Sequence, residues 1–213
     1  MADNYGNLGI LADIRGDLDA TKSFYTQALK LNEKLERKEG IANQYGNLGN
    51  VAQARGDLDA AEGFYNQALK LNKKLGRKEG MANQYGSLGN VARVRGDLDA
   101  AEGFHNQSLK LDKKLGRKEG MAANYGNLGI VAQIRGDLDA AEGFHNQSLK
   151  LNKKLGSKEG MAANYSNLGL LEEARGNPKA ARDHLITARD LFATIGMPHM
   201  VEKTQGLLDD LGP

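Results

Sequence analysis

The chain has 213 residues, of which 40% are hydrophobic and 26% are charged. This balance is typical of a folded soluble protein and excludes a disordered chain. The formal net charge is only +2 and cysteine is absent, so the composition excludes a global field that would recruit nucleic acid, and it excludes disulfides and thiolate metal sites.

The first 14 residues lack the basic start and apolar core of an export signal. No apolar run is long enough to span a bilayer. We therefore expect a cytoplasmic location.

A 40-residue period organises the chain. The segment from Tyr45 to Asn50 recurs from Tyr85 to Asn90, with variants at three other places, and Arg-Gly-Asp-Leu-Asp-Ala occurs four times. A chain that repeats one supersecondary unit buries each unit against its neighbours, which gives a linear stack with a long continuous surface. We expect one repeat domain over 1–213, with repeats at about 1–37, 38–77, 78–117, 118–157 and 158–196.

The first repeat starts in the middle of its expected first helix, near Tyr5. Its first turn and any N-terminal cap are therefore missing from the pattern. We expect either a trimmed repeat or an end that associates with another molecule.

Each complete repeat predicts two helices. In the third repeat, apolar residues three or four positions apart predict one helix from Lys78 to Arg95 and a second from Asp97 to Leu115. The second apolar stripe includes Leu115. Because the connections are short, the two helices are expected to be antiparallel.

The Arg-Gly-Asp sequence between the helices is interpreted as a turn. Gly96 can take a left-handed conformation there, and either Asp97 or Asp99 can cap the second helix. Turn chemistry accounts for this triplet, so no adhesion role is assigned to it.

Glycines inside the helices are expected to permit close approach of backbones, because each costs about 1 kcal/mol relative to alanine. Gly49 lies in the apolar stripe and is expected at a contact between helices, whereas Gly46 is expected on the exposed side. Gly63 is a glycine of the second helix and is expected to allow close approach as well.

The C-terminal repeat differs from the others. Pro178 suits the first position of a helix, and Pro198 opens a final helix over about 198–211. In that helix Thr204 and Leu208 are expected to face inward while Glu202 faces water, which is the pattern of a capping helix.

The repeat resembles the tetratricopeptide repeat (TPR). The resemblance covers essentially the whole chain and is carried by Tyr45, Leu48, Gly49, Gly56, Ala61, Tyr65 and Ala68. Ala52 and Lys73 depart from the family pattern. The 40-residue period resembles the subfamily of kinesin light chains, LGN/Pins adaptors and many bacterial repeat proteins. The resemblance implies an all-α, right-handed α-solenoid (superhelix) of five antiparallel helix hairpins plus a C-terminal capping helix.

The resemblance also implies a concave groove lined by the first helix of each repeat. The amides on that helix can pair with the backbone of an extended peptide, and the later repeats offer apolar pockets. The candidate partner-binding residues are Asn43, Asn47, Asn50, Gln53, Asn83, Asn90, Arg93, Asn127, Ile130, Gln133, Ile134 and Leu170. The alternative for the amides is a solvated surface or pairing across repeats.

We predict a protein–protein interaction scaffold that binds a peptide, with Arg93 selecting an acidic group. One alternative is a self-assembling structural module that associates through the first repeat. Another is contact of the lysine rows, such as Lys70 and Lys110, with an anionic surface; no aromatic residues interleave with these lysines, so neither a nucleic acid nor a membrane partner is expected.

His105 and His145 replace tyrosines one period apart. A shared metal ion is one interpretation, and buried packing is the favoured one, because no metal-ligand spacing is present. No phosphate-binding loop or catalytic order of residues is found, so neither an enzyme nor a cofactor is predicted.

Overall fold

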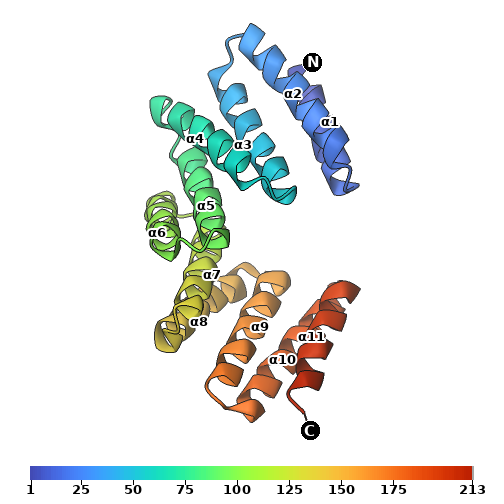
Figure 1. The fold of residues 1–213 in the computed structure, drawn as a ribbon, viewed down its shortest axis with the longest axis vertical. Helices are drawn as coiled ribbons and strands as arrows, with labels where there is room; N and C mark the ends of the chain where they lie inside the picture. The colour runs from blue at the N-terminus through green and yellow to red at the C-terminus, as the bar shows by residue number, and fades with distance from the viewer. Residues whose placement is uncertain (213) are drawn as a thin grey trace. The chain divides into compact units, whose positions relative to one another are not determined.

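The computed structural model describes residues 1–212, which contain eleven α-helices and no strand (Figure 1). The helices are α1 (Ala2–Ile14), α2 (Leu18–Lys34), α3 (Lys38–Ala54), α4 (Leu58–Lys74), α5 (Lys78–Val94), α6 (Leu98–Leu115), α7 (Lys118–Ile134), α8 (Leu138–Leu155), α9 (Lys158–Ala174), α10 (Pro178–Thr194) and α11 (Pro198–Asp210). The prediction of an all-α protein with five helix pairs and a final helix is confirmed.

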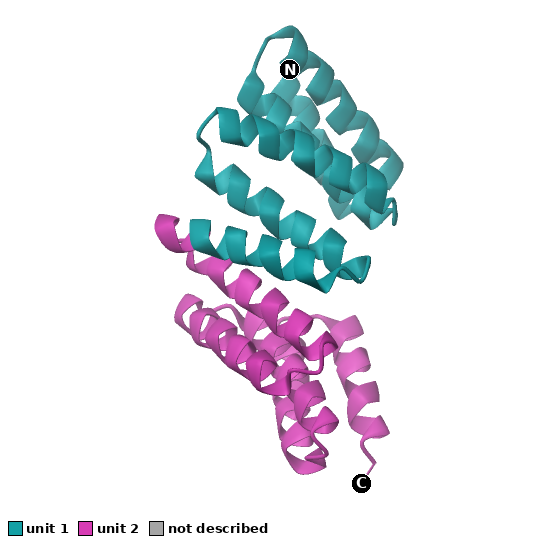
Figure 2. Ribbon diagram, turned by 60° about the vertical axis from the view of Figure 1, so that its left-hand side comes forward, with its two compact units in different colours: residues 1–111 teal, residues 112–213 magenta. Residues whose placement is uncertain are grey.

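Two compact units make up the chain, residues 1–111 and 112–213, and their boundary falls within α6 (Figure 2). The first unit contains α1 to α5 and most of α6. The second contains the end of α6 and α7 to α11. The prediction of a single domain stays a prediction.

The turn inside each repeat ends one helix and caps the next. In the second repeat Gly56 has φ +77°, and the Asp57 N–H donates to the Ala52 carbonyl at 2.9 Å, which is the Schellman arrangement that left-handed glycine permits. The Asp57 carboxylate then accepts from the Ala60 N–H at 3.0 Å. The equivalent Asp97 accepts from the Ala100 N–H. The first aspartate of the motif, and not the second, is therefore the cap.

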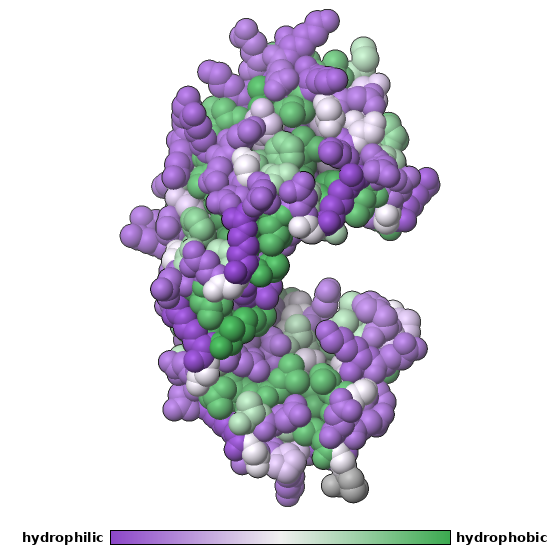
Figure 3. All heavy atoms as spheres, in the orientation of Figure 1, coloured by the Kyte–Doolittle hydropathy of each residue, from purple (hydrophilic) through white to green (hydrophobic). Residues whose placement is uncertain are grey.

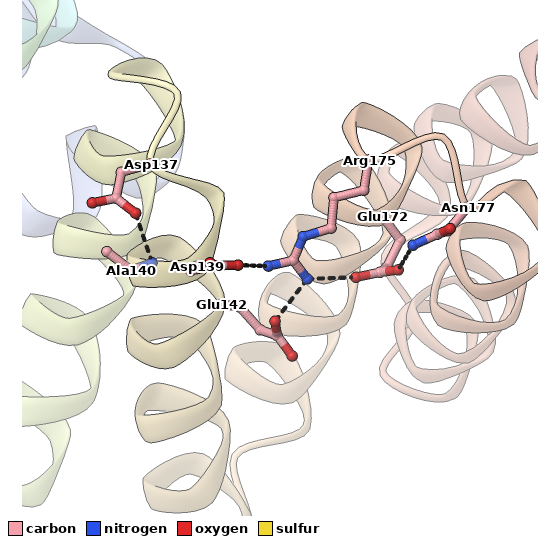
Figure 4. A network of polar contacts seen from close by, with 7 residues as sticks. All are labelled: Asp137, Asp139, Ala140, Glu142, Glu172, Arg175 and Asn177. Carbon is pink, nitrogen blue, oxygen red and sulfur yellow. Dashed lines mark hydrogen bonds and ion pairs between the residues drawn. The ribbon is translucent and has the colours of Figure 1, made fainter.

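The arginine of the same motif joins neighbouring repeats. Arg175 lies 2.6 Å from Asp139 and 2.7 Å from Glu142, both on α8, and 3.0 Å from Glu172 on its own helix (Figure 4). Arg55 pairs with Asp19 in the same way. Each arginine thus fixes the register of its helix against the second helix of the preceding repeat, a role that sequence reasoning missed.

Both within and between repeats, a glycine lets a larger side chain of the neighbouring helix pack directly against the backbone. A Cβ added at Gly49 would lie 2.5 Å from Cε1 of Tyr65, a residue of α4 that is only 1% exposed. A Cβ added at Gly80 would lie 2.3 Å from Oδ1 of the buried Asn72. The first contact joins α3 to α4 and the second joins α4 to α5. The prediction that Gly49 is a contact point is confirmed.

Three placements from the sequence were wrong. Gly46 is buried and faces Gln84 of α5, because the first helices of successive repeats also approach one another. Gly63 has open space where its Cβ would be, so it permits no close approach. Leu115 is 40% exposed, since the apolar stripe of α6 ends before the last turn. In the capping helix, by contrast, Thr204 and Leu208 are buried as predicted.

The two glycines Gly49 and Gly63 give a matched test of this packing. Gly49→Ala is expected to lower the free energy of unfolding by about 1–2 kcal/mol, because overpacking against Tyr65 exceeds the gain in helix propensity. Gly63→Ala makes the same chemical change in open space and is expected to raise it by about 0.5–1 kcal/mol. Urea unfolding followed by circular dichroism measures both. Equal effects of the two changes would contradict the close packing of Tyr65 against Gly49.

Candidate functional site

Two hollows occur at equivalent places in the repeats, one in each unit. The hollow of the first unit has a volume of about 450 Å³ and lies between α3 and α5. The hollow of the second unit has a volume of about 530 Å³ and lies between α7 and α9. In both, the end of the intervening second helix supplies the floor. The same repeat positions therefore build the same kind of concave site twice.

The hollow of the first unit is polar and contains Arg77. The Arg77 guanidinium donates to Asn43 Oδ1 at 3.0 Å and to Asn72 Oδ1 at 3.2 Å, and it pairs with Glu39 at 2.8 Å. This arginine spans the site from the floor to the rim. It lies in the connection between α4 and α5, outside both predicted helices, so the sequence analysis did not include it.

The hollow of the second unit is more apolar. Ser157 stands at the repeat position of Arg77, Ala123 at that of Asn43, and Ile130 at that of Asn50. Because serine is shorter than arginine, the second hollow lacks the side chain that crosses the first one. The alanine and the isoleucine replace two amides with apolar side chains. Figure 3 shows hydrophobic and hydrophilic side chains interspersed on the visible face of each unit.

The floor of the second hollow is a buried polar network. Ser148 Oγ donates to the Ala122 carbonyl at 2.8 Å, and Asn152 Nδ2 donates to Asn164 Oδ1 at 2.8 Å. These side chains are nearly fully buried. Because their hydrogen bonds are made within the protein, they hold the shape of the site and leave the rim to contact a ligand.

The rim carries amides without a partner in the protein. Asn47 lines the first hollow, and Asn127 and Asn167 line the second; all three occupy the same repeat position. Within residues 1–212 none of these three side chains makes a hydrogen bond. Asn167 was missed by the sequence analysis, although the 40-residue period from Asn127 points to it. A row of free amides offers donors and acceptors at a fixed spacing.

The pattern of helix pairs, left-handed glycine turns and repeated hollows agrees with a comparison to known families. Residues 3–188 match the family described as the MalT-like TPR region. The chain belongs to this TPR family. The match covers most of the chain, and it confirms the resemblance that the sequence carries. No curated protein matches the chain significantly.

Solved structures share the TPR fold. BtubC (BKLC) from P. vanneervenii has a TM-score of 0.78 at 23% identity, over 91% of this chain and 80% of that one. The apo form of RapI has a TM-score of 0.86 at 15% identity, over 100% and 77%. A putative kinesin light chain from Podospora anserina with nearly identical TPR-like repeats has a TM-score of 0.69 at 19% identity, over 91% and 95%.

TPR folds generally serve as protein-interaction scaffolds and are typically not catalytic. The chain is a repeat scaffold with this fold. No helix in residues 1–212 is both long and apolar enough to cross a membrane.

The TPR structure brings half of the twelve candidate residues to the hollows. Four line the first hollow: Asn43, Asn47, Asn50 and Asn83. Two line the second: Asn127 and Ile130. The other six lie outside both: Gln53, Asn90, Arg93, Gln133, Ile134 and Leu170.

Two of the candidate amides, Asn50 and Gln53, lie beside a buried tyrosine hydroxyl of their own TPR hairpin. The Tyr65 hydroxyl lies 2.9 Å from Asn50 Oδ1 and 2.9 Å from Gln53 Oε1, and its single proton can be donated to only one of them at a time. Burial raises the pKa of Tyr65 to about 12. Asn50 and Gln53 are therefore partly committed to Tyr65 before any partner arrives.

The histidines are packed side chains. His105 and His145 are both 0% exposed, and a Cβ added at Gly129 would lie 2.6 Å from Cε1 of His145. Both ring nitrogens of His145 lack a hydrogen-bond partner, and burial lowers the pKa of His145 to about 4. Among residues 1–212 no group of three potential metal ligands gathers. The geometry agrees with the packing interpretation.

Some lysines of the TPR second helices contact aromatic rings of the next repeat. The Nζ atoms of Lys73 and Lys153 lie 5.5 and 5.6 Å from the ring centroids of Tyr85 and Tyr165. Cation–π contact ties these lysines to their own scaffold. These lysines therefore take part in the contacts between repeats.

Proposed function

We propose that the chain binds an extended segment of a partner protein along the first helices of its repeats. The observation that supports this most directly is the repeated hollow whose rim bears Asn47, Asn127 and Asn167 with no internal hydrogen bonds. An amide that neighbours do not use can accept from and donate to a peptide backbone. The cytoplasm is the expected location of this interaction.

The two hollows favour different segments. At the first, Arg77 lies among amides and can donate to an acidic or carbonyl group of the partner once its contacts to Asn43 and Glu39 rearrange. At the second, Ile130 and the small residues Ala123 and Ala163 leave room for an apolar side chain. We therefore propose a polar or acidic segment at the first unit and a hydrophobic anchor at the second.

The remaining candidates keep secondary roles in this proposal. Asn90 and Arg93 on α5 each have a buried polar atom without a hydrogen-bond partner, which suits a pair that reorganises around an acidic group. On the first helices of the later repeats, Gln133, Ile134 and Leu170 flank the second hollow in sequence and extend the contact surface.

Selection of peptides from a displayed random library, followed by affinity measurement, tests the proposal. Asn127→Ala together with Asn167→Ala is expected to weaken a selected peptide about tenfold or more, because each lost hydrogen bond is worth about 1 kcal/mol. The matched control is Asn66→Ala with Asn106→Ala, which makes the same chemical change at exposed positions of α4 and α6.

The outcomes separate cleanly. Peptides that lose affinity only with the groove variant support the proposal. If a peptide has the same affinity for the groove double variant as for the control double variant, the interaction lies on another surface, and the groove proposal is wrong. Circular dichroism shows whether both variants keep the helical fold, since their substituted side chains make no internal hydrogen bond.

A further inference from the structure

The residue that precedes the first helix of a repeat is an arginine at three places and a serine at the fourth. Arg37, Arg77 and Arg117 precede α3, α5 and α7. Ser157 precedes α9 and caps it, because its Oγ accepts from the Gly160 N–H at 3.2 Å. The second hollow, which Ser157 lines, is therefore built without the arginine that crosses the first.

In the first hollow this arginine has three acceptors. Arg77 Nη1 donates to Asn43 Oδ1 at 3.0 Å and to Asn72 Oδ1 at 3.2 Å. Arg77 Nη2 lies 2.8 Å from a Glu39 carboxylate oxygen. Asn72 is 2% exposed, whereas Glu39 is exposed on α3. The planar guanidinium thus joins a buried amide oxygen at the floor to a carboxylate outside.

Asn152 occupies the floor of the second hollow, at the repeat position of Asn72. It is 8% exposed, and its Nδ2 donates to Asn164 Oδ1 at 2.8 Å. Within residues 1–212 its Oδ1 accepts no hydrogen bond. A buried amide oxygen without a donor has lost its hydration and gained nothing in return. A donor that enters the hollow is therefore favoured at this atom.

Glu119 supplies a carboxylate to the second hollow, at the repeat position of Glu39. In the described part of the chain its carboxylate forms no ion pair and no hydrogen bond. Of the described residues that line this hollow, it is the one with a charge. The third acceptor is lost, since Ala123 stands at the position of Asn43. The second hollow thus keeps two of the three acceptors and lacks the arginine that would use them.

The following repeat shows a different outcome where the arginine is also absent. Met197 stands at the arginine position and Phe192 at that of the floor asparagine. Phe192 is 2% exposed, and Met197 packs against its apolar cluster. There the chain fills the place with its own hydrocarbon, and phenylalanine offers no acceptor. The acceptors kept at Glu119 and Asn152 therefore distinguish the second hollow as a place for a cation.

We propose that an arginine side chain of the partner segment enters the second hollow and takes the place that Arg77 has in the first. The inference rests on the proposed function, because it identifies one side chain of the bound segment. The guanidinium donates to Asn152 Oδ1 and pairs with Glu119, and its methylene stem lies along the alanines that line the hollow. Arginine suits the place better than lysine because its planar fork reaches an amide oxygen and a carboxylate at once. The hydrophobic anchor proposed at Ile130 lies beside it.

Selection from a displayed library of random peptides tests the inference, with the unmodified chain and Ser157→Arg as parallel targets. Peptides selected by the unmodified chain are expected to be enriched in arginine. The Ser157→Arg chain fills the place with its own side chain. It is expected to lose this enrichment and to bind the arginine peptides about tenfold more weakly, since a hydrogen bond to a charged group is worth about 1.5–3 kcal/mol. Ser157→Ala removes the same helix cap but leaves the hollow open, and it is expected to keep the arginine preference.

A double-mutant cycle with one selected peptide assigns the ion pair. Replacing its arginine by citrulline keeps the shape and removes the charge, and is expected to weaken binding about tenfold. Glu119→Gln is expected to weaken the arginine peptide about threefold and to have no further effect on the citrulline peptide. The matched control Glu159→Gln makes the same change at an exposed position outside the second hollow and is expected to leave both affinities unchanged. Isothermal titration calorimetry measures all of them.

The results distinguish this inference from the groove proposal. Peptides that depend on Asn127 and Asn167 without arginine enrichment would overturn the inference and leave the groove proposal standing. Arginine peptides that respond to Glu119→Gln but not to the double amide variant would support the inference and remove the proposed role of the amides. Equal effects of Glu119→Gln and Glu159→Gln, or failure to select any peptide, would overturn the arginine site.

Discussion

Lowering the pH from 7.5 to below 4 is expected to reduce the free energy of unfolding by about 3 kcal/mol through His145 alone. The side chain is 0% exposed, and burial lowers its pKa from 6.5 to about 4. The unfolded chain therefore takes up a proton near pH 6.5, while the folded chain resists it. The contribution to stability is complete above pH 6.5, falls as the pH drops from 6.5 to 4, and changes no further below 4.

Urea unfolding at closely spaced pH values measures this loss. The control is His145→Leu, because Leu185 occupies the same position of the next repeat and is 0% exposed there against Gly169. Every other titratable group is the same in the two proteins, so the difference between the two curves isolates His145. Parallel curves between pH 7.5 and 4 would show that the buried ring is protonated without cost, against the geometry described here.

The sequence predicted the helix pairs well because their signals are local. Gly56 and Asp57 end one helix and cap the next through bonds within a few residues, and the same letters recur every 40 positions. Because the sequence repeats every 40 residues, the prediction made for one hairpin extends to all five. The prediction that Gly49 is a contact point between helices was correct for the same reason, since Gly49 and Tyr65, which packs against it, belong to one hairpin.

The sequence predicted the site less well because the site depends on contacts between repeats. Asn50 looked free, yet it lies beside the Tyr65 hydroxyl. Arg77 looked like a linker residue, yet it crosses the first hollow. Gly46 looked exposed, yet it faces the next first helix. The helical pattern gives the direction of a side chain relative to its own helix, and only the stacking of helices decides what that side chain meets.

The position shared by Leu8 and Leu48 shows how much stability that stacking provides. Leu48→Ala is expected to lower the free energy of unfolding by about 2–4 kcal/mol, because Leu48 is 4% exposed and packs with Tyr25 and Val51. Leu8→Ala makes the same change where the side chain is 41% exposed, and its cost is expected to be below about 1 kcal/mol, since alanine also has the higher helix propensity. Urea unfolding measures both.

Equal costs of the two substitutions would contradict this account, because they make the same chemical change at two leucines that differ in burial. The comparison therefore measures the packing of one repeat against the next and leaves the helix propensity of the two sites aside.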